Sequence, residues 1–217
     1  MAVAVEPSHL SSSPLREERN EKNFTMEFEI QTAEIVHQTI HSLLFDKGVQ
    51  LNGFTNGMVE PKFSTDETKR AFFSLKGACK QFMKLNSREI ADKANQIVVS
   101  DTMVCVAFHK TMYSIFEDDI NWGRVVAMFC FSAAIALKAY EDNKFKTIDS
   151  IEGWMTTFIN DNLQDWILKH RGWGGLPDKF NDDKISGDIQ KGSNGGTWLT
   201  LAAVGIGAFA LTAILGR

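Results

Sequence analysis

Residues 125–137 are Val-Val-Ala-Met-Phe-Cys-Phe-Ser-Ala-Ala-Ile-Ala-Leu, a run of thirteen residues without a charge that lies between Arg124 and Lys138. A helix made of this run is apolar on every side, so it must lie in a protein core or in a membrane. Thirteen residues rise only about 20 Å, whereas the hydrocarbon core of a bilayer is about 30 Å thick. We therefore expect this run to be the central helix of a bundle.

Amphipathic segments on both sides of the run predict the helices that surround it. Apolar residues recur at helical spacing in most of them, and Ser64, Ser87 and Asp101 are placed to cap three of the helices. The Ser64-x-x-Glu67 pair has the form of a capping box. The expected helices cover about 24–46, 65–86, a short segment after Ser87, a segment after Asp101, 148–163, 166–169 and 176–181. Strand patterns are nearly absent, so the predicted fold is all-α, with roughly eight helices around a buried central helix hairpin.

Composition excludes several classes of function. The 23 Lys and Arg are scattered and fewer than the 27 Asp and Glu, which does not suit a nucleic-acid-binding face. The three cysteines are far apart and form no Cys-x-x-Cys pair, so we expect neither a zinc site nor a disulfide framework. This use of cysteine favours a protein that works in a reducing compartment. Sequence signatures of hydrolases, metalloproteases and phosphate-binding loops are missing. We expect no enzyme activity and no cofactor.

Two histidines share one face of the first expected helix. His37 and His41 are four residues apart and Glu34 precedes them, a spacing at which a metal ion is conceivable. Both histidines fall at the margin of the apolar face, where a solvated histidine is ordinary. We interpret them as surface residues and predict no metal site.

The two ends of the chain differ from its middle. Residues 1–22 are polar and rich in Ser and charge, which predicts a disordered arm before a helical domain at 23–182. After a flexible linker at 183–196, residues 197–216 carry no charge. Within them, the 18 largely apolar residues Trp198–Leu215 would rise about 27 Å as a helix, enough for a membrane span. We expect a C-terminal tail anchor rather than the alternative, a buried terminal helix. The anchor residues are Trp198, Leu199, Leu201, Val204, Ile206, Phe209, Leu211, Ile214 and Leu215.

The four residues before the apolar run, Asn121-Trp122-Gly123-Arg124, carry most of the functional information. Asn121 is a good helix N-cap. Gly123 weakens the first turn, which suggests that another backbone approaches it closely. Arg124 lies at the positive end of the helix dipole, where a cation is unfavourable. An arginine at this place favours a carboxylate that comes from another molecule.

This stretch resembles a known family. Ile115-Phe116 through Asn121-Trp122-Gly123-Arg124 to Phe131 is similar to the first homology motif of the B-cell lymphoma 2 family of apoptosis regulators. Residues 166–173, with Trp166, Gly172 and Trp173, resemble the family's second motif, and residues 34–44 its fourth. Together with the tail anchor, the resemblance covers roughly residues 24–217.

The third motif is where this sequence departs from the family. One alignment places Cys79 and Lys80 where relatives carry Gly-Asp, and a shifted alignment uses Gly77 and Ala78. Neither alignment supplies the aspartate that pairs with the motif-one arginine of a partner.

The resemblance implies a groove that receives an amphipathic death-motif helix from a pro-apoptotic relative, including Bak-like and Bax-like effectors. Asn121 would hydrogen-bond this helix, Gly123 would admit its small residue and Arg124 would pair its aspartate. Lys93 and Asn86 stand where relatives often have apolar groove residues. Seven residues would form the apolar lining, here called the groove set: Phe82, Ile90, Thr111, Ile115, Val126, Phe131 and Phe180.

The family contains pro-survival guardians and Bax-like or Bak-like effectors that oligomerise and permeabilise the mitochondrial outer membrane. Because the third motif lacks its acid, we predict a guardian on the mitochondrial outer membrane that faces the cytosol, with the endoplasmic reticulum as a further location. The effector remains the alternative, and a third is a membrane-active scaffold that binds no death-motif helix. Whether the chain forms homo- or heterodimers is left open.

Overall fold

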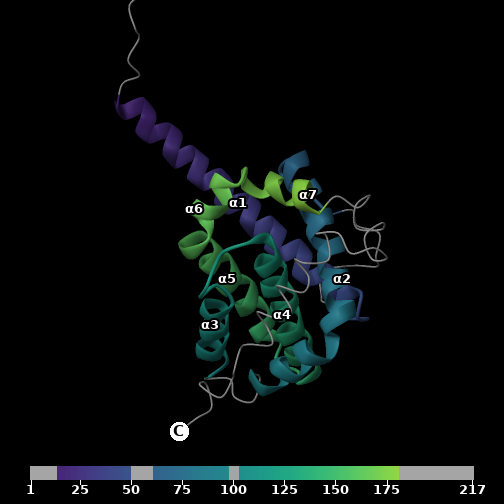
Figure 1. Cartoon of the computed structure of the whole chain (residues 1–217). Helices are drawn as coiled ribbons and strands as arrows, with labels where there is room; N and C mark the ends of the chain where they lie inside the picture. Colours follow the sequence, from purple (N-terminus) through teal and green to yellow (C-terminus); the bar gives the residue numbers. More distant parts are fainter. Residues whose placement is uncertain (1–13, 50–60, 98–102, 181–217) are drawn as a thin grey trace, which may run out of the picture.

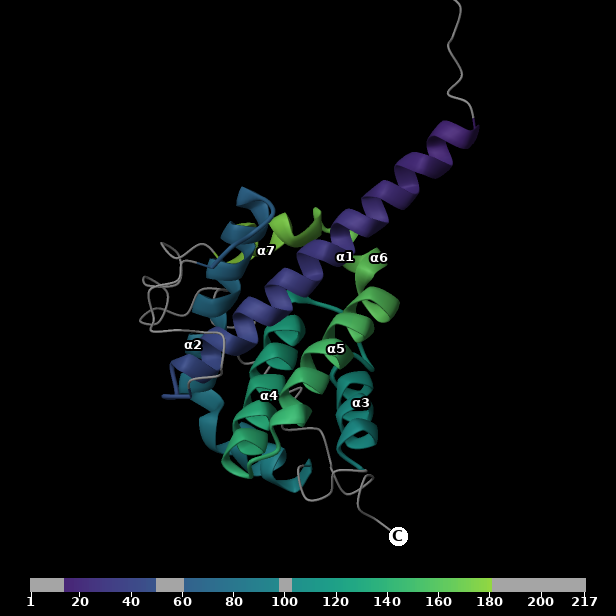
Figure 2. The ribbon, with the colours of Figure 1, turned by 180° about the vertical axis from the view of Figure 1, so that it is seen from behind.

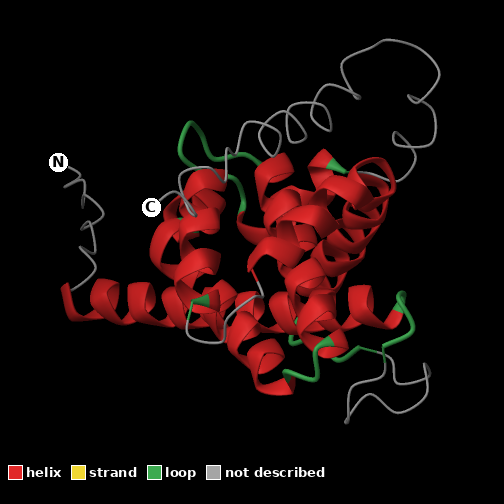
Figure 3. Cartoon of the chain, turned by 90° about the horizontal axis from the view of Figure 1, so that it is seen from below, coloured by secondary structure: helices red, strands yellow, loops and turns green. Residues whose placement is uncertain are grey.

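The computed structural model describes residues 14–49, 61–97 and 103–180, and every regular element among them is a helix (Figures 1 and 3). The elements are α1 (Pro14–Phe45), α2 (Asp66–Ile97), α3 (Val104–Ile115), α4 (Trp122–Glu141), α5 (Phe145–Asn162), α6 (Gln164–Lys169), the 3-10 helix η1 (Gly172–Gly174) and α7 (Gly175–Lys179). The all-α prediction is confirmed. The expected linker at 183–196 and tail anchor at 197–216, with all nine anchor residues, lie outside the described residues.

Helix α4 is the core of the bundle, as the charge-free run predicts. Along Val125–Ala136 every residue is buried, and α1, α2, α3 and α5 all pack on this helix. It is the one helix in the described ranges that is long and apolar enough to cross a membrane, but 83% of its most apolar window is buried inside the bundle. Its buried hydroxyl, on Ser132, donates to the carbonyl of Met128 at 2.8 Å. Helix α4 is thus explained as the core of a bundle.

Helix α1 runs diagonally across α4 and α5, and its N-terminal half extends beyond the rest of the bundle (Figure 2). It begins at Pro14, so residues 14–22, expected in a disordered arm, are helical. Segment 15–22 consists almost entirely of Leu, Arg, Glu and Lys, which are strong helix formers. Pro14 itself is well suited to the first position of a helix. These local preferences outweigh the polarity that suggested disorder.

Helix α2 joins two segments that the sequence analysis separates. It continues through Ser87, which was expected to cap a new helix. The stretch around Ser87 has no Gly or Pro and is rich in Lys, Leu, Arg and Glu. The side-chain amide of Asn86 donates to the carbonyl of Phe82 at 2.9 Å, within the same helix. A cap signal inside such a stretch is therefore overridden.

The capping box expected at the start of α2 is also wrong. At the start of α2, the hydroxyl of Thr65 accepts the N–H of Thr68 at 3.1 Å, while Ser64 donates through its N–H and its hydroxyl to the Glu34 carboxylate, at 3.0 and 2.9 Å. Glu67, the other half of the expected capping box, accepts the N–H of Gly174 at 3.0 Å. Helix α3 starts after Met103 with no side-chain cap, and Asp101 lies outside the described residues.

Candidate functional site: the Arg124 corner and the groove set

The guanidinium of Arg124 lies in a corner formed by the end of α3, the α3–α4 loop and the start of α4. One nitrogen, Nη1, donates to the carbonyl of Ile115 at 2.8 Å, and Nη2 donates to Oδ2 of Asp118 at 3.0 Å. The Arg124 side chain is 13% exposed, whereas the side chain of Asp118 is 83% exposed. A largely buried cation is therefore paired with a carboxylate that stands in solvent. The sequence argument left Arg124 without a local partner, and the structure supplies this one.

The corner is held in place by the cap of α4. Asn121 has extended backbone angles, and its Oδ1 accepts the N–H of Arg124 at 3.0 Å, which is the predicted N-cap. Its Nδ2 donates to Asp119 at 3.4 Å. Gly123 is buried directly before the arginine. The backbone around Arg124 is thus fixed by a local hydrogen bond.

Tryptophans of the motif-two segment pack beneath the start of α4. Trp122 contacts Trp166 edge to face, with ring centroids 5.1 Å apart, and lies 6.1 Å from Trp173. Trp173 is fully buried, and its Nε1 donates to the hydroxyl of Thr32 on α1 at 3.0 Å. This cluster joins α1, α4 and η1 next to the first turn of α4, where Arg124 begins its path to the corner.

Glycines allow the chain to turn tightly around Trp173. Gly172 has a φ of +60°, a left-handed conformation that favours glycine. A Cβ on Gly175 would lie 2.0 Å from the carbonyl oxygen of His170, which no side chain tolerates. The Gly-Trp-Gly-Gly segment is therefore required for the close packing of η1 and α7.

The seven residues of the groove set are all buried, and all but Thr111 belong to the apolar core. Their exposed fractions lie between 0% and 8%, so the described structure has them packed rather than lining an open trough. The hydroxyl of Thr111 donates to the carbonyl of Ala107 within α3. Phe180, at the end of α7, is brought to the bundle by the packing of α7 and η1 on α2. A helix that uses the groove set must therefore displace part of the present packing.

Burial discriminates between the two alignments of the third motif. Cys79 is fully buried, and Lys80 is exposed and pairs with Asp46 at the end of α1 at 3.1 Å. The shifted alignment would put the acid at Ala78, which is fully buried. A carboxylate at position 78 would be buried in the core, which costs free energy. Burial therefore favours the alignment that places Lys80 at the position of the family aspartate.

Lys93 lies on the later half of α2 with most of its side chain buried. Its amine is 3.5 Å from Glu89, one helical turn earlier. Burial lowers the pKa of Lys93 below its ordinary value, and the charge of Glu89 and its hydrogen bond oppose this effect without cancelling it. A cation thus stands where the resemblance expects an apolar residue.

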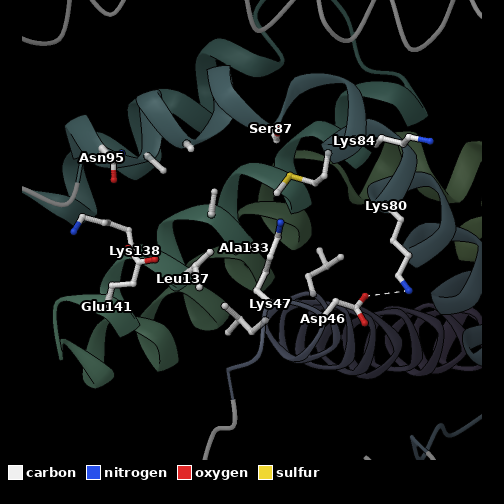
Figure 4. A pocket seen from close by; sticks show the side chains of 16 residues that line it. Asp46, Lys47, Lys80, Lys84, Ser87, Asn95, Ala133, Leu137, Lys138 and Glu141 are labelled. Atoms are coloured by element: carbon white, nitrogen blue, oxygen red, sulfur yellow. Dashed lines mark ion pairs between the residues drawn. The ribbon is translucent and has the colours of Figure 1, made fainter.

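A cavity of about 790 Å³ lies between the end of α1, the middle of α2 and the end of α4 (Figure 4). None of the groove set lines it. Its apolar wall includes Leu43 and Leu137, and its rim carries Lys47, Lys84 and the Asp46–Lys80 ion pair. This cavity is a separate feature from the predicted groove.

His37 and His41, interpreted from the sequence as solvated surface residues, join α1 to α5 through Glu152. The sequence analysis did not find this contact, and the side chain of His41 is only 12% exposed. Nδ1 of His37 lies 2.8 Å from Oε2 of Glu152, and Nε2 of His41 lies 2.8 Å from Oε1. The hydrogen bond to Glu152 raises the pKa of His37 against the opposing effect of burial. Burial alone would raise the pKa of Glu152, but hydrogen bonds and charges of both histidines outweigh it and lower that pKa. Glu34, which precedes the histidines in sequence, instead bonds to Ser64.

The fold and the corner together define a class of protein: an all-α bundle on one buried central helix, with an arginine held at the rim beside a helix cap. A family model described as apoptosis regulator proteins, Bcl-2 family, matches residues 75–173, which include the corner and both tryptophan segments. Residues 75–173 are therefore similar to the Bcl-2 family of apoptosis regulators.

Curated relatives carry names from the same family. The chain is 29% identical over 142 residues to apoptosis regulator R1 of Xenopus laevis and 27% identical over 145 residues to Bcl-2-like protein 1 of Gallus gallus. These matches cover 65% and 66% of this chain, and the chain spans about three fifths of the length of these relatives, 61% and 63%.

Two solved structures share the fold. Trichoplax adhaerens trBcl-2L2 bound to trBak BH3 has a TM-score of 0.64 at 24% identity, covering 70% of this chain and 98% of that chain. Chicken BOK has a TM-score of 0.61 at 20% identity, covering 71% and 97%. At these identities the likeness concerns the fold alone.

Proposed function

We propose that this chain is a pro-survival regulator of apoptosis that sequesters the amphipathic death-motif helix of pro-apoptotic relatives, and so restrains permeabilisation of the mitochondrial outer membrane. The Arg124 corner is the observation that carries the proposal. A helix that presents an aspartate at this corner would replace the solvent-exposed Asp118 with a carboxylate shielded by an interface. Charge pairs that are shielded from water gain more than exposed pairs do.

The groove set supplies the apolar part of the proposed interface. Its members come from α3, α4, the end of α7 and α2, on which the other three helices pack. The trBcl-2L2 of Trichoplax, which shares the fold, was solved with the trBak BH3 bound. An amphipathic helix in a hydrophobic groove is a common mode of peptide recognition.

The guardian is favoured over the effector by the third-motif face of α2. An effector must offer this face to the arginine of a neighbour, and here the position of the aspartate carries Lys80, which pairs with Asp46. A lysine would meet that arginine with like charge. We further propose that residues 197–216 anchor the chain in the mitochondrial outer membrane and leave the bundle in the cytosol.

The test is a calorimetric titration of the full chain in lipid nanodiscs with a panel of death-motif helical peptides. We expect submicromolar binding of at least one peptide and a loss of at least about tenfold in Arg124→Ala, because truncating one partner of a shielded charge pair costs about 2–5 kcal/mol. Arg171→Ala is the matched control, since Arg171 is exposed and pairs with Asp178 near α7.

Two outcomes would contradict the proposal. If no peptide binds, the groove function is wrong and the membrane-active scaffold takes its place. If peptides bind but the chain itself releases dye from liposomes of mitochondrial composition, the effector alternative is correct.

A further inference from the structure

The cluster of His37, His41 and Glu152 lies on α1 and α5, apart from every residue that the proposed function uses. One ligand atom of each residue lies within 4.8 Å of the other two. The side chains of His41 and Glu152 are 12% and 18% exposed, while that of His37 is 45% exposed. The cluster is therefore mostly enclosed and has one side open to solvent.

The donor atoms suit a particular class of ion. Two imidazole nitrogens and one carboxylate oxygen form a set that Zn²⁺ and similar transition metals accept, with water in a fourth position. Histidines four residues apart present their rings on the same face of a helix, which is the spacing that lets one helix supply two ligands. Magnesium and calcium prefer sets made only of oxygen atoms.

The present distances are close to those that an ion would need. In a tetrahedral site with bonds of about 2.1 Å, neighbouring ligand atoms lie roughly 3.4 Å apart. His37 lies 2.8 Å from Oε2 of Glu152 and His41 lies 2.8 Å from Oε1, while one ligand atom of each residue lies within 4.8 Å of the other two. Side-chain rotations that open the short contacts and close the longer separations would bring three ligand atoms to about 3.4 Å from one another. Oε1 of Glu152 is buried and faces Nε2 of His41 at 2.8 Å, so the carboxylate presents both of its oxygens to the two imidazole rings.

We propose that His37, His41 and Glu152 form a binding site for a divalent transition-metal ion of the Zn²⁺ type, with water as the fourth ligand, and that the bound ion clamps α1 to α5. The bridging protons leave as the ion enters. Because the folded bundle brings the three ligands together from positions 115 residues apart, the ion binds the folded state and stabilises it.

The test uses the full chain in lipid nanodiscs, in a Cys105→Ser background because the Cys105 sulfur lies 3.6 Å from Nδ1 of His109 and offers a competing pair. Zn²⁺ is titrated by calorimetry, and the thermal transition is followed with Zn²⁺ or with chelator. We expect one ion per chain, a higher transition temperature with Zn²⁺, and no such effect of Mg²⁺.

Two substitutions of ligand residues and one control substitution locate the site. His41→Gln and Glu152→Gln should each weaken Zn²⁺ binding at least about tenfold, because each removes a direct ligand. His170→Gln is the matched control, since His170 stacks on Trp166 instead. NMR signals of the imidazole rings, recorded in the Cys105→Ser chain with all histidines intact, add a measurement that does not depend on the folding of the ligand variants. The signals of His37 and His41 should shift when Zn²⁺ is added, and the signal of His170 should not.

The proposal is overturned if the background chain binds no Zn²⁺, if Mg²⁺ stabilises it equally, or if the histidine signals stay in place while Zn²⁺ binds. In each case the cluster is an ion pair and nothing more. None of these results bears on peptide binding at the Arg124 corner, so the two proposals fail independently.

Discussion

At the scale of single residues, the Arg124–Asp118 pair is the contact on which the proposed binding depends. Arg124 is held on two sides, by the carbonyl of Ile115 and by Asp118. The carbonyl belongs to the end of α3 and stays in place, but Asp118 stands in solvent and is a competitor for any incoming carboxylate. Exposed ion pairs contribute about 1 kcal/mol or less, so the competitor is easily displaced.

We therefore predict that Asp118→Asn tightens the binding of a death-motif peptide by up to about fivefold, the factor that corresponds to about 1 kcal/mol. The free energy of unfolding should fall by no more than a similar amount. Calorimetry and thermal unfolding of the same preparation measure both. Asp119→Asn is the neighbouring control, because Asp119 contacts Asn121 and not the guanidinium. Weaker binding in Asp118→Asn would show that Asp118 positions Arg124 rather than competing for it.

Residues also show what the sequence could predict and what it could not. The cap on α4 was predictable because Asn121 and the N–H of Arg124 are three residues apart. The role of Asp118 was not, because it reaches Arg124 across a loop whose shape no local rule specifies. The carboxylate of Glu67 was assigned to its own helix, yet it contacts Gly174, a residue 107 positions away.

At the scale of elements, uniform patterns were predicted well and competing signals were not. The burial of helix α4 was predictable from its thirteen residues without a charge. Such a run must lie in a core or in a membrane, and thirteen residues are too short to cross a membrane. At Ser87 a cap signal competed with helix formers on both sides, and the helix formers prevailed in α2. The pairing of α1 with α5 through Glu152 has no local signal at all.

The pairing of α1 with α5 predicts a pH dependence of stability in metal-free protein. The pKa of His37 is raised above 6.5 on folding, so its contribution is full below pH 6.5 and is lost as the pH rises through the folded value. The pKa of Glu152 is lowered below 4.5, so its contribution is present above pH 4.5 and is lost as the pH falls through the folded value. Both contributions are complete only between about pH 4.5 and 6.5.

The measurement is the difference in unfolding free energy between the unsubstituted chain and Glu152→Gln, with chelator present. It should be larger near pH 5.5 than at pH 8.5, by about 1 kcal/mol or less because His37 is partly exposed to screening solvent. Glu27→Gln, at an exposed position of α1, should show no such window. A difference that is constant with pH would mean that the histidines interact with Glu152 only as neutral hydrogen-bond donors.

At the scale of the whole molecule, the closed state of the groove set would govern how a peptide binds in the proposed function. The seven residues are packed in the core, so a helix reaches them only after the elements around them separate. Glu67 opposes this separation, because it ties α2 to the η1–α7 segment that ends in Phe180. Binding that waits for such an opening is slower than the ordinary range of about 10⁵–10⁷ M⁻¹s⁻¹.

We predict that, in stopped-flow experiments with a labelled death-motif peptide, the observed association rate reaches a plateau as the peptide concentration rises. The plateau is the rate at which the free protein opens, since the peptide selects a minor open state. Glu67→Ala removes the tie to Gly174 and should raise the plateau. Arg124→Ala should instead speed dissociation, because it removes the charge partner of the bound peptide. A rate that rises linearly with concentration, at ordinary speed, would contradict the closed groove but not the binding itself. The plateau therefore separates the question of whether the chain captures a helix from the question of how the bundle admits it.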